Sequence, residues 1–182
     1  FDVDGFNLHA VHTGDDTLPT LFFIHGSPGS WNAFEVYLKD KDLLKKYRMY
    51  SIDRPGFGYS QFGNDMNMED QAKIIYPFIN SIKNGKPLYI IGHSLGGMSV
   101  LNAIRQNFQV KKAVIIGSGD IIQDIIDDFI SKLQLKPEYG IKLRNHFEAK
   151  FGGEMDDYSA YKAAEKTEIP ILIIHDKDDD DV

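Results

Sequence analysis

Short apolar runs alternate with longer amphipathic stretches along most of this chain. The apolar runs show little internal alternation and occupy residues 20–24, 49–52, 88–91, 113–116 and 171–174. Runs of this kind are typical of strands in a parallel sheet whose two faces are both covered. Patterns with helical spacing occupy 32–46, 68–82, 98–108 and 121–133. The alternation predicts an α/β fold with a mostly parallel central sheet flanked by helices.

Two features modify this plan. Residues 1–3 and 6–10 alternate apolar with polar side chains around Asp4-Gly5, which predicts an antiparallel hairpin at one edge of the sheet. Pro77 lies inside the 68–82 pattern and is expected to kink or interrupt that helix.

The length of 182 residues predicts a single domain, 1–182, in which 120–169 forms a small helical insert after the 113–116 strand. The insert is a candidate cap over a functional site. In the alternative interpretation, its apolar stripe at 121–133 packs on the sheet. The chain begins with Phe1 and stops soon after a strand, so both ends are expected to be cut, with a C-terminal strand and helix missing.

Composition excludes several functions. The net charge is −7, so nucleic acid is an unexpected partner. No apolar run approaches the length of a membrane span. The chain has no cysteine, which excludes disulfides and thiolate metal sites, and we expect neither a metal nor a cofactor. The compartment stays open, with the cytoplasm favoured because cysteine and a signal-like segment are absent from these residues. The sequence gives no indication of oligomeric state.

In a parallel sheet, ligands bind beyond the carboxyl ends of the strands. The loops that start at His25, Asp53, Gly92, Gly117 and Asp176 lie there. The site is expected among them.

The segment GHSLG at 92–96 carries the strongest motif. It matches G-x-S-x-G between a predicted strand and a predicted helix, the context of a nucleophile elbow. Ser94 would be the nucleophile, and the Leu95 amide would donate to an oxyanion. Gly92, His93 and Gly96 would support the turn. The alternative is a structural turn whose serine caps the following helix.

The segment HGSPGS at 25–30 ends the first central strand. Its glycines and proline shape a loop that can present the Ser27 amide as a second oxyanion donor. His25 and Gly26 would support that loop, His25 as a hydrogen bonder. The segment DRPGFGYS at 53–60 is interpreted as scaffolding, with Asp53 and Arg54 able to pair across the turn.

These motifs, in this order, resemble those of serine hydrolases with the α/β-hydrolase fold, an esterase- and lipase-like superfamily. The resemblance spans nearly the whole chain and is least specific at 120–170. It implies an eight-stranded sheet and a Ser–acid–His triad in that order. It also makes epoxide hydrolase and dehalogenase chemistry unexpected, because those relatives carry aspartate where this chain has Ser94.

By the same resemblance, the triad acid follows the 171–174 strand. Aligning His175 and Val182 with the family pattern places it at Asp179, with Asp178 and Asp180 within a one-residue slip. Asp120 is a second candidate, although Gln123 three residues later also suggests a capping box. A calcium loop in the acidic run lacks the glycine and glutamate of an EF-hand.

No histidine stands where the base is expected, after the acid. The six histidines are His9, His12, His25, His93, His146 and His175. We therefore expect the base to lie outside this sequence. The predicted function is a serine hydrolase that cleaves a carboxylic ester or related acyl substrate. The alternatives are a non-catalytic protein of the same fold that binds a ligand or a partner, and a hydrolase of thioesters or carbon–carbon bonds.

Overall fold

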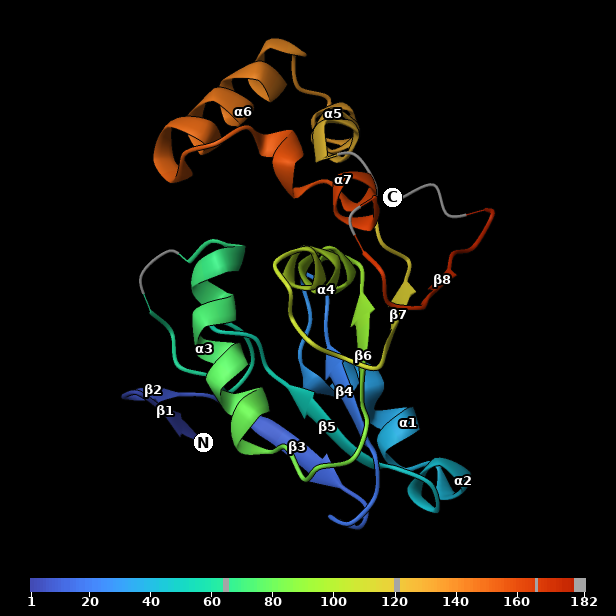
Figure 1. Ribbon diagram of the computed structural model, residues 1–182. Helices are drawn as coiled ribbons and strands as arrows, with labels where there is room; N and C mark the ends of the chain where they lie inside the picture. Colours follow the sequence, from blue (N-terminus) through green and yellow to red (C-terminus); the bar gives the residue numbers. More distant parts are fainter. Residues whose placement is uncertain (64–65, 120–121, 166, 179–182) are drawn as a thin grey trace.

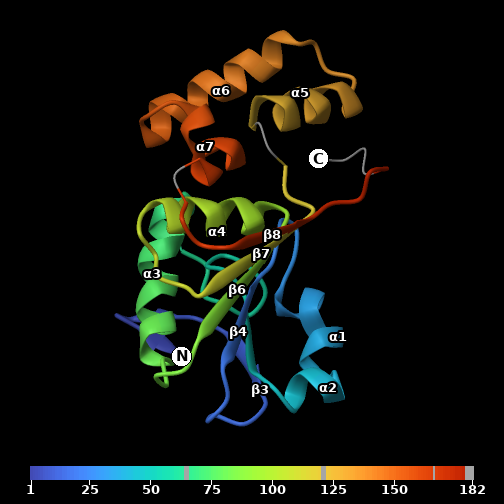
Figure 2. The same cartoon turned by 45° about the vertical axis from the view of Figure 1, so that its right-hand side comes forward.

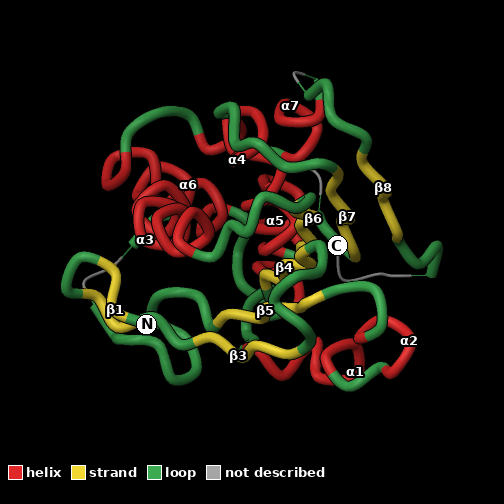
Figure 3. The backbone as a smooth tube through the Cα atoms, turned by 60° about the horizontal axis from the view of Figure 1, so that its bottom comes forward, coloured by secondary structure: helices red, strands yellow, loops and turns green. Residues whose placement is uncertain are grey.

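The computed structural model describes residues 1–63, 66–119, 122–165 and 167–178. Its centre is a six-stranded sheet in the order β3-β5-β4-β6-β7-β8 (Figures 1 and 3). The strands are β3 (Ala10–Thr13), β4 (Thr20–Ile24), β5 (Arg48–Ile52), β6 (Leu88–His93), β7 (Lys112–Ile116) and β8 (Ile171–Ile174). All five apolar runs therefore form strands, and these five are mutually parallel, as predicted.

The antiparallel edge differs from the expectation. β1 (Asp2–Val3) and β2 (Phe6–Asn7) form the predicted hairpin, but as a separate two-stranded sheet. The edge strand is β3, which pairs with β5 in antiparallel register. The hairpin instead binds the loop after β5, because Gln61 N–H donates to the Asn7 carbonyl over 2.8 Å and the Asn7 N–H donates to the Gln61 side chain.

Helices cover both faces of the sheet (Figures 1 and 2). α3 (Met68–Ser81) and α4 (Leu95–Arg105) lie on one face. The other face carries the 3₁₀ helix η1 (Trp31–Phe34) with α1 (Glu35–Leu38) and α2 (Lys41–Leu44). The single helix predicted at 32–46 is thus three short ones. The break comes at Asp40, whose side chain accepts hydrogen bonds from the Asp42 and Leu43 amides and starts a new helix.

Pro77 does not interrupt α3, which is continuous from Met68 to Ser81. A proline inside a helix removes one backbone hydrogen bond. The lost hydrogen bond is offset by the burial of apolar side chains before and after Pro77, because Ile75, Phe78 and Ile79 pack against the sheet. Tertiary packing therefore overrides the local preference.

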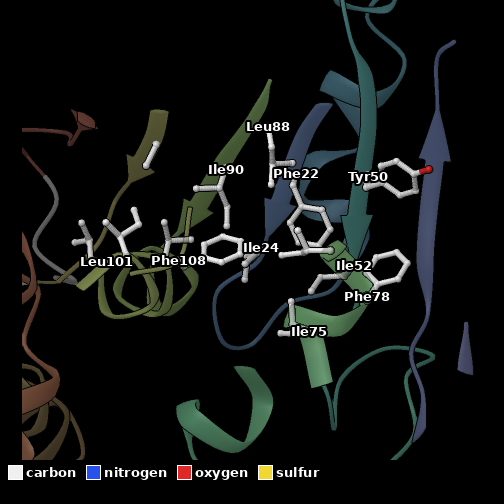
Figure 4. Packing of buried hydrophobic residues seen from close by; sticks show 14 of the residues in the cluster. Phe22, Ile24, Tyr50, Ile52, Ile75, Phe78, Leu88, Ile90, Leu101 and Phe108 are labelled. Atoms are coloured by element: carbon white, nitrogen blue, oxygen red, sulfur yellow. The ribbon is translucent and has the colours of Figure 1, made fainter. Parts of the chain in front are cut away.

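The strands send alternate side chains to two apolar clusters. Phe22 and Ile24 of β4 join the larger cluster beneath α3 and α4, whereas Phe23 joins the smaller one beneath α1. Figure 4 shows the larger cluster, in which Phe78 of α3 lies beside Ile52 of β5. Both faces of β4 are therefore apolar, which explains the lack of alternation in its sequence.

The insert after β7 contains α5 (Ile122–Lys132), α6 (Glu138–Phe151), η2 (Met155–Tyr158) and α7 (Ala160–Ala164). The stripe of α5 does not pack on the sheet: Ile126 and Ile130 are buried with Met155 in a third cluster that belongs to the insert itself. Arg144 of α6 binds Gln123 of α5 and Asp156 of η2. In Figures 1 and 2, α5 and α6 lie beyond α4, on the side toward which β6 points.

β8 forms the second edge of the sheet (Figure 3). Leu172, Ile173 and Ile174 are 47–64% exposed. Within the part of the chain that the structure describes, no helix has the length and apolar composition of a membrane span.

Candidate active site

Ser94 occupies the sharp turn between β6, which ends at His93, and α4, which begins at Leu95. Its backbone angles are φ 52° and ψ −126°, a conformation that side chains other than glycine rarely adopt. The Ser94 N–H donates to the Ile116 carbonyl over 2.9 Å, and its carbonyl accepts from the Gly97 N–H over 2.8 Å. The turn is therefore held from both sides in a strained conformation.

The Ser94 side chain is half-exposed and makes no capping hydrogen bond to α4. Ser94 stands at the N-cap position of α4, but the side-chain hydrogen bond that the alternative interpretation requires is not formed. The Ser94 hydroxyl forms no hydrogen bond with another of the described residues.

Two glycines of the motif allow β6, α4 and β4 to come together. A Cβ atom on Gly92 would lie 2.6 Å from the Gly96 carbonyl oxygen. A Cβ atom on Gly96 would lie against the Ile24 carbonyl and 2.6 Å from the His25 carbonyl oxygen. Any side chain at either position would collide with backbone, so glycine is required by space.

The loop after β4 lies directly against Ser94. A Cβ atom on Gly26 would be 2.8 Å from the Ser94 Cβ and 3.2 Å from its Oγ. Ser27 follows, exposed, and is joined to Pro28 by a cis peptide bond. Neither the Ser27 amide nor the Leu95 amide donates to another protein group in the described part of the chain. Both N–H groups remain available to a ligand.

The His25 side chain holds this loop in place through two hydrogen bonds. Its side chain is fully buried, and its Nε2 accepts a hydrogen bond from the Arg54 N–H over 3.0 Å. Its Nδ1 therefore carries the proton and donates to the Gly26 carbonyl over 2.7 Å. The Arg54 guanidinium donates to the same carbonyl over 2.8 Å. Both ring nitrogens of His25 are occupied, so this histidine is not placed to accept a proton from Ser94.

Fold stability is expected to decrease at acidic pH because of His25. Burial is the main cause that lowers the pKa of the His25 imidazole below its ordinary value. In the unfolded chain the ring titrates near its ordinary pKa, so below that pH the unfolded state binds the additional proton. This contribution to stability is present above the unfolded pKa and is lost as the pH falls toward the folded pKa. The slope approaches about 1.4 kcal/mol per pH unit at most.

Urea unfolding of the protein between about pH 8 and about pH 5 measures this slope. The variant His25→Gln should show a shallower decrease than the unmodified protein. His146 is exposed, so His146→Gln is the control that should keep the full slope. Equal slopes in the three proteins would contradict the assignment.

Asp53 and Arg54 do not pair with each other, contrary to the expectation. Asp53 is fully buried, and its carboxylate accepts from the amides of Trp31 and Tyr59 over 2.6 and 2.9 Å. Its third partner is His9 Nδ1, at 2.8 Å. Arg54 instead stacks its guanidinium on the Phe57 ring. The segment is nevertheless scaffolding, as interpreted, because Asp53 joins three segments of chain.

The remaining histidines lie elsewhere. His12 stacks on Tyr50 of β5 and contacts Asp16. His93, His146 and His175 are exposed, at the end of β6, in α6 and after β8. Within the described part of the chain, none of these four rings is hydrogen-bonded to the Ser94 hydroxyl.

Three of the candidate acids, Asp120, Asp179 and Asp180, lie outside the described residues. Asp178 is exposed after β8, and its amide donates to the Asp176 side chain over 3.1 Å. No group of His, Asp and Glu side chains in the described part of the chain is arranged to hold a metal ion.

Comparison with known proteins agrees with this geometry. Residues 19–152 match the model of the alpha/beta hydrolase fold family. Epoxide hydrolase 1 of Caenorhabditis elegans is 30% identical over 50% of this chain and 22% of its own length. The uncharacterized hydrolase YugF of Bacillus subtilis is 28% identical over 64% of this chain and 42% of its own. The sn-1-specific diacylglycerol lipase ABHD11 of Mus musculus is 27% identical over 57% of this chain and 34% of its own length.

The chain thus spans less than half the length of each of these relatives. Among solved structures, an alpha/beta hydrolase fold protein from Burkholderia ambifaria superimposes with a TM-score of 0.67. The superposition covers 96% of this chain and 78% of the other chain, at 16% sequence identity. At that identity it shows a likeness of fold alone. The matched residues include the four central strands β4 to β7, the Ser94 turn and the loop against it, and the chain belongs to the α/β-hydrolase fold family.

Proposed function

We propose that this protein is a serine hydrolase that cleaves a carboxylic ester or a related acyl substrate, with Ser94 as the nucleophile. The observation that carries the proposal is the strained turn at Ser94, a partly exposed residue whose side chain does not cap α4. A protein that needed only a tight turn here would avoid the strain with glycine. Strain that is retained at a serine favours a chemical role for its side chain.

The oxyanion donors in this proposal are the amides of Leu95 and Ser27. Both N–H groups lack a protein acceptor within the described residues, and Gly26 brings their loops into contact. Leu95 also begins α4, so the positive end of the helix dipole favours charge that develops at this point. Each such donor typically contributes about a hundred- to a thousand-fold in rate.

The triad acid in this proposal is Asp179, and the base is a histidine outside these 182 residues. Support comes from the histidines of the described chain, since His25 and His9 are engaged elsewhere and no other ring is hydrogen-bonded to Ser94. A serine hydroxyl needs a base to become a nucleophile. The helices α5 and α6 would form a cap, because they lie beyond the end of β6.

Acyl transfer fits a serine better than the epoxide opening that the name of one relative indicates. Attack of a serine on a carbonyl yields an ester, which water can cleave by attacking the same carbon. Attack on an epoxide would yield an ether, which has no carbonyl for water to attack. Thioester and carbon–carbon bond hydrolysis use the same acyl-enzyme and remain alternatives. A non-catalytic binding protein is the second candidate, favoured by the lack of a histidine at Ser94 in the described residues.

Labelling with a fluorophosphonate tests the proposal. The natural full-length protein should gain one adduct, which peptide mass spectrometry should locate at Ser94. The variant Ser94→Ala should gain none, and Ser81→Ala, at the end of α3, should label like the unmodified protein. Absence of an adduct on the unmodified, folded protein would reject the hydrolase proposal and favour the binding protein.

A further inference from the structure

The peptide between Gly26 and Ser27 is fixed by two side chains that donate to its carbonyl. The Gly26 carbonyl accepts hydrogen bonds from His25 Nδ1 over 2.7 Å and from Arg54 Nη2 over 2.8 Å. A carbonyl oxygen has two lone pairs, so both are used. His25 and Arg54 are 0% and 1% exposed, so rotation of this peptide would leave two buried donors without an acceptor. The peptide is therefore held in one orientation.

This orientation determines where the Ser27 N–H is directed. The peptide bond between Gly26 and Ser27 is trans, and the cis bond of this loop is the next one along the chain. In a planar trans peptide the N–H points opposite to the carbonyl. The carbonyl is directed toward the buried side chains of His25 and Arg54, whereas Ser27 itself is exposed. The Ser27 N–H is therefore directed away from these side chains, on a loop whose Gly26 lies against Ser94.

The Arg54 guanidinium is itself held in place by its surroundings. Its Cζ lies 4.4 Å from the centroid of the Phe57 ring, and its Nη1 donates to the Gln71 side chain over 3.2 Å. A planar guanidinium that is stacked and hydrogen-bonded on two sides is already oriented, so little freedom is lost in the bond to Gly26. The donor is therefore as rigid as the peptide that it holds.

Arg54 also places a positive charge behind this peptide. Burial lowers the pKa of its guanidinium to about 10, which leaves it charged at neutral pH. The carboxylate of the adjacent Asp53 is bound by three groups from other segments, and within the described residues no carboxylate is ion-paired with Arg54. Hydrogen bonds that share one peptide polarise each other. A cationic donor on the Gly26 carbonyl therefore makes the Ser27 N–H a stronger donor.

We propose that Arg54 is a positioning residue of the oxyanion hole, which holds the Ser27 N–H toward the reacting oxygen and strengthens it as a donor. This inference rests on the proposed function of Ser94 and gives Arg54 a role beyond scaffolding. Arg54 touches no substrate and acts through the Ser27 amide. The oxyanion forms only after the substrate has bound, so loss of Arg54 should lower kcat and leave KM nearly unchanged.

Hydrolysis of a p-nitrophenyl ester by the natural full-length protein tests this role. The variant Arg54→Gln keeps an N–H donor but removes the charge, and its kcat should be at least tenfold lower with KM within threefold. Arg54→Lys keeps the charge and should have at least threefold higher kcat than Arg54→Gln. Arg48 is also buried, at the opposite end of β5, where it donates to Thr20. Arg48→Gln is the matched control, which should lose stability but keep kcat.

The NMR signal of the Ser27 amide tests the positioning without any need for activity. A hydrogen bond on a carbonyl affects the amide of the next residue, so the Ser27 signal should move in Arg54→Gln and stay in Arg48→Gln. If Arg54→Gln does not fold, Arg54→Lys takes its place and should move the signal and keep kcat within tenfold.

An unchanged Ser27 signal would overturn the proposal. So would an unchanged kcat in Arg54→Gln, a kcat in Arg54→Lys as low as in Arg54→Gln, or a loss of more than tenfold in a folded Arg54→Lys. If the unmodified protein neither turns over the ester nor gains a fluorophosphonate adduct, the proposed function fails instead. The Ser27 signal then still decides whether Arg54 positions this amide.

Discussion

Replacing Ser94 with glycine is expected to abolish turnover and, in the same variant, to stabilise the fold. Loss of a serine nucleophile typically lowers kcat by about 10⁴-fold or more. Glycine adopts φ 52° and ψ −126° without the steric cost that serine bears, which is about 1–3 kcal/mol. Most variants that lose activity also lose stability. A variant that loses activity and gains stability therefore indicates a strained residue with a catalytic role.

The measurements are kcat/KM on a p-nitrophenyl ester and the free energy of unfolding in urea, both on the natural full-length protein. Gln134 has φ 54° and is exposed, so Gln134→Gly is the matched control. It should also gain stability but keep full activity. Retained turnover in Ser94→Gly would reject Ser94 as the nucleophile, and a loss of stability would reject strain at the turn.

Replacing Gly96 with alanine is expected to destabilise the protein by about 3 kcal/mol or more. Helix propensity alone predicts the opposite, since alanine is favoured over glycine by about 1 kcal/mol within a helix. We expect a loss of stability because there is no room for the new Cβ, which would collide with the carbonyl groups of Ile24 and His25. These belong to the backbone where β4 ends, and they cannot move without disturbing the central strand and the loop at Gly26.

Gly97→Ala is the matched control for this prediction. Its Cβ would lie 2.8 Å from the Ile115 Cγ2 and 3.0 Å from the Ser118 Cβ, both of them side-chain atoms. These contacts are longer than the contacts that Gly96→Ala would make with the Ile24 and His25 carbonyl oxygens, so the cost of Gly97→Ala should be smaller, about 1–2 kcal/mol. Urea unfolding should show Gly96→Ala to be the less stable of the two variants by about 1 kcal/mol or more. Equal effects would show that β4 and α4 approach less closely than the structure has them.

The strands and the Ser94 turn could be predicted because local sequence determines both. A strand buried on two faces must be apolar throughout, and a strand-to-helix turn packed against β4 must have glycine at Gly92 and Gly96. These requirements are visible within a few residues. The role of Ser94 and its oxyanion donors stays a prediction until the labelling experiment is done.

Long-range pairings could not be predicted in the same way. The Asp53 carboxylate is hydrogen-bonded to His9, which is 44 residues away in the sequence, and not to the adjacent Arg54. Whether two groups meet depends on the order of strands, and nothing in the residues around Asp53 specifies it. The amphipathic stripe of α5 shows the same limit: helical spacing predicts a buried face but not the partner, which is η2 and α6 and not the sheet.

The separate apolar cluster of the insert affects how the molecule unfolds. Ile126, Ile130 and Met155 are buried together, whereas the clusters of the sheet contain none of them. Segments with few buried contacts to the rest of a protein open as cooperative units, at a free energy below that of global unfolding. We therefore expect α5 and α6, with η2, to open at a lower free energy than β4, β6 and the Ser94 turn. Ligand access to the ends of the strands would then be governed by a local equilibrium and not by the stability of the whole domain.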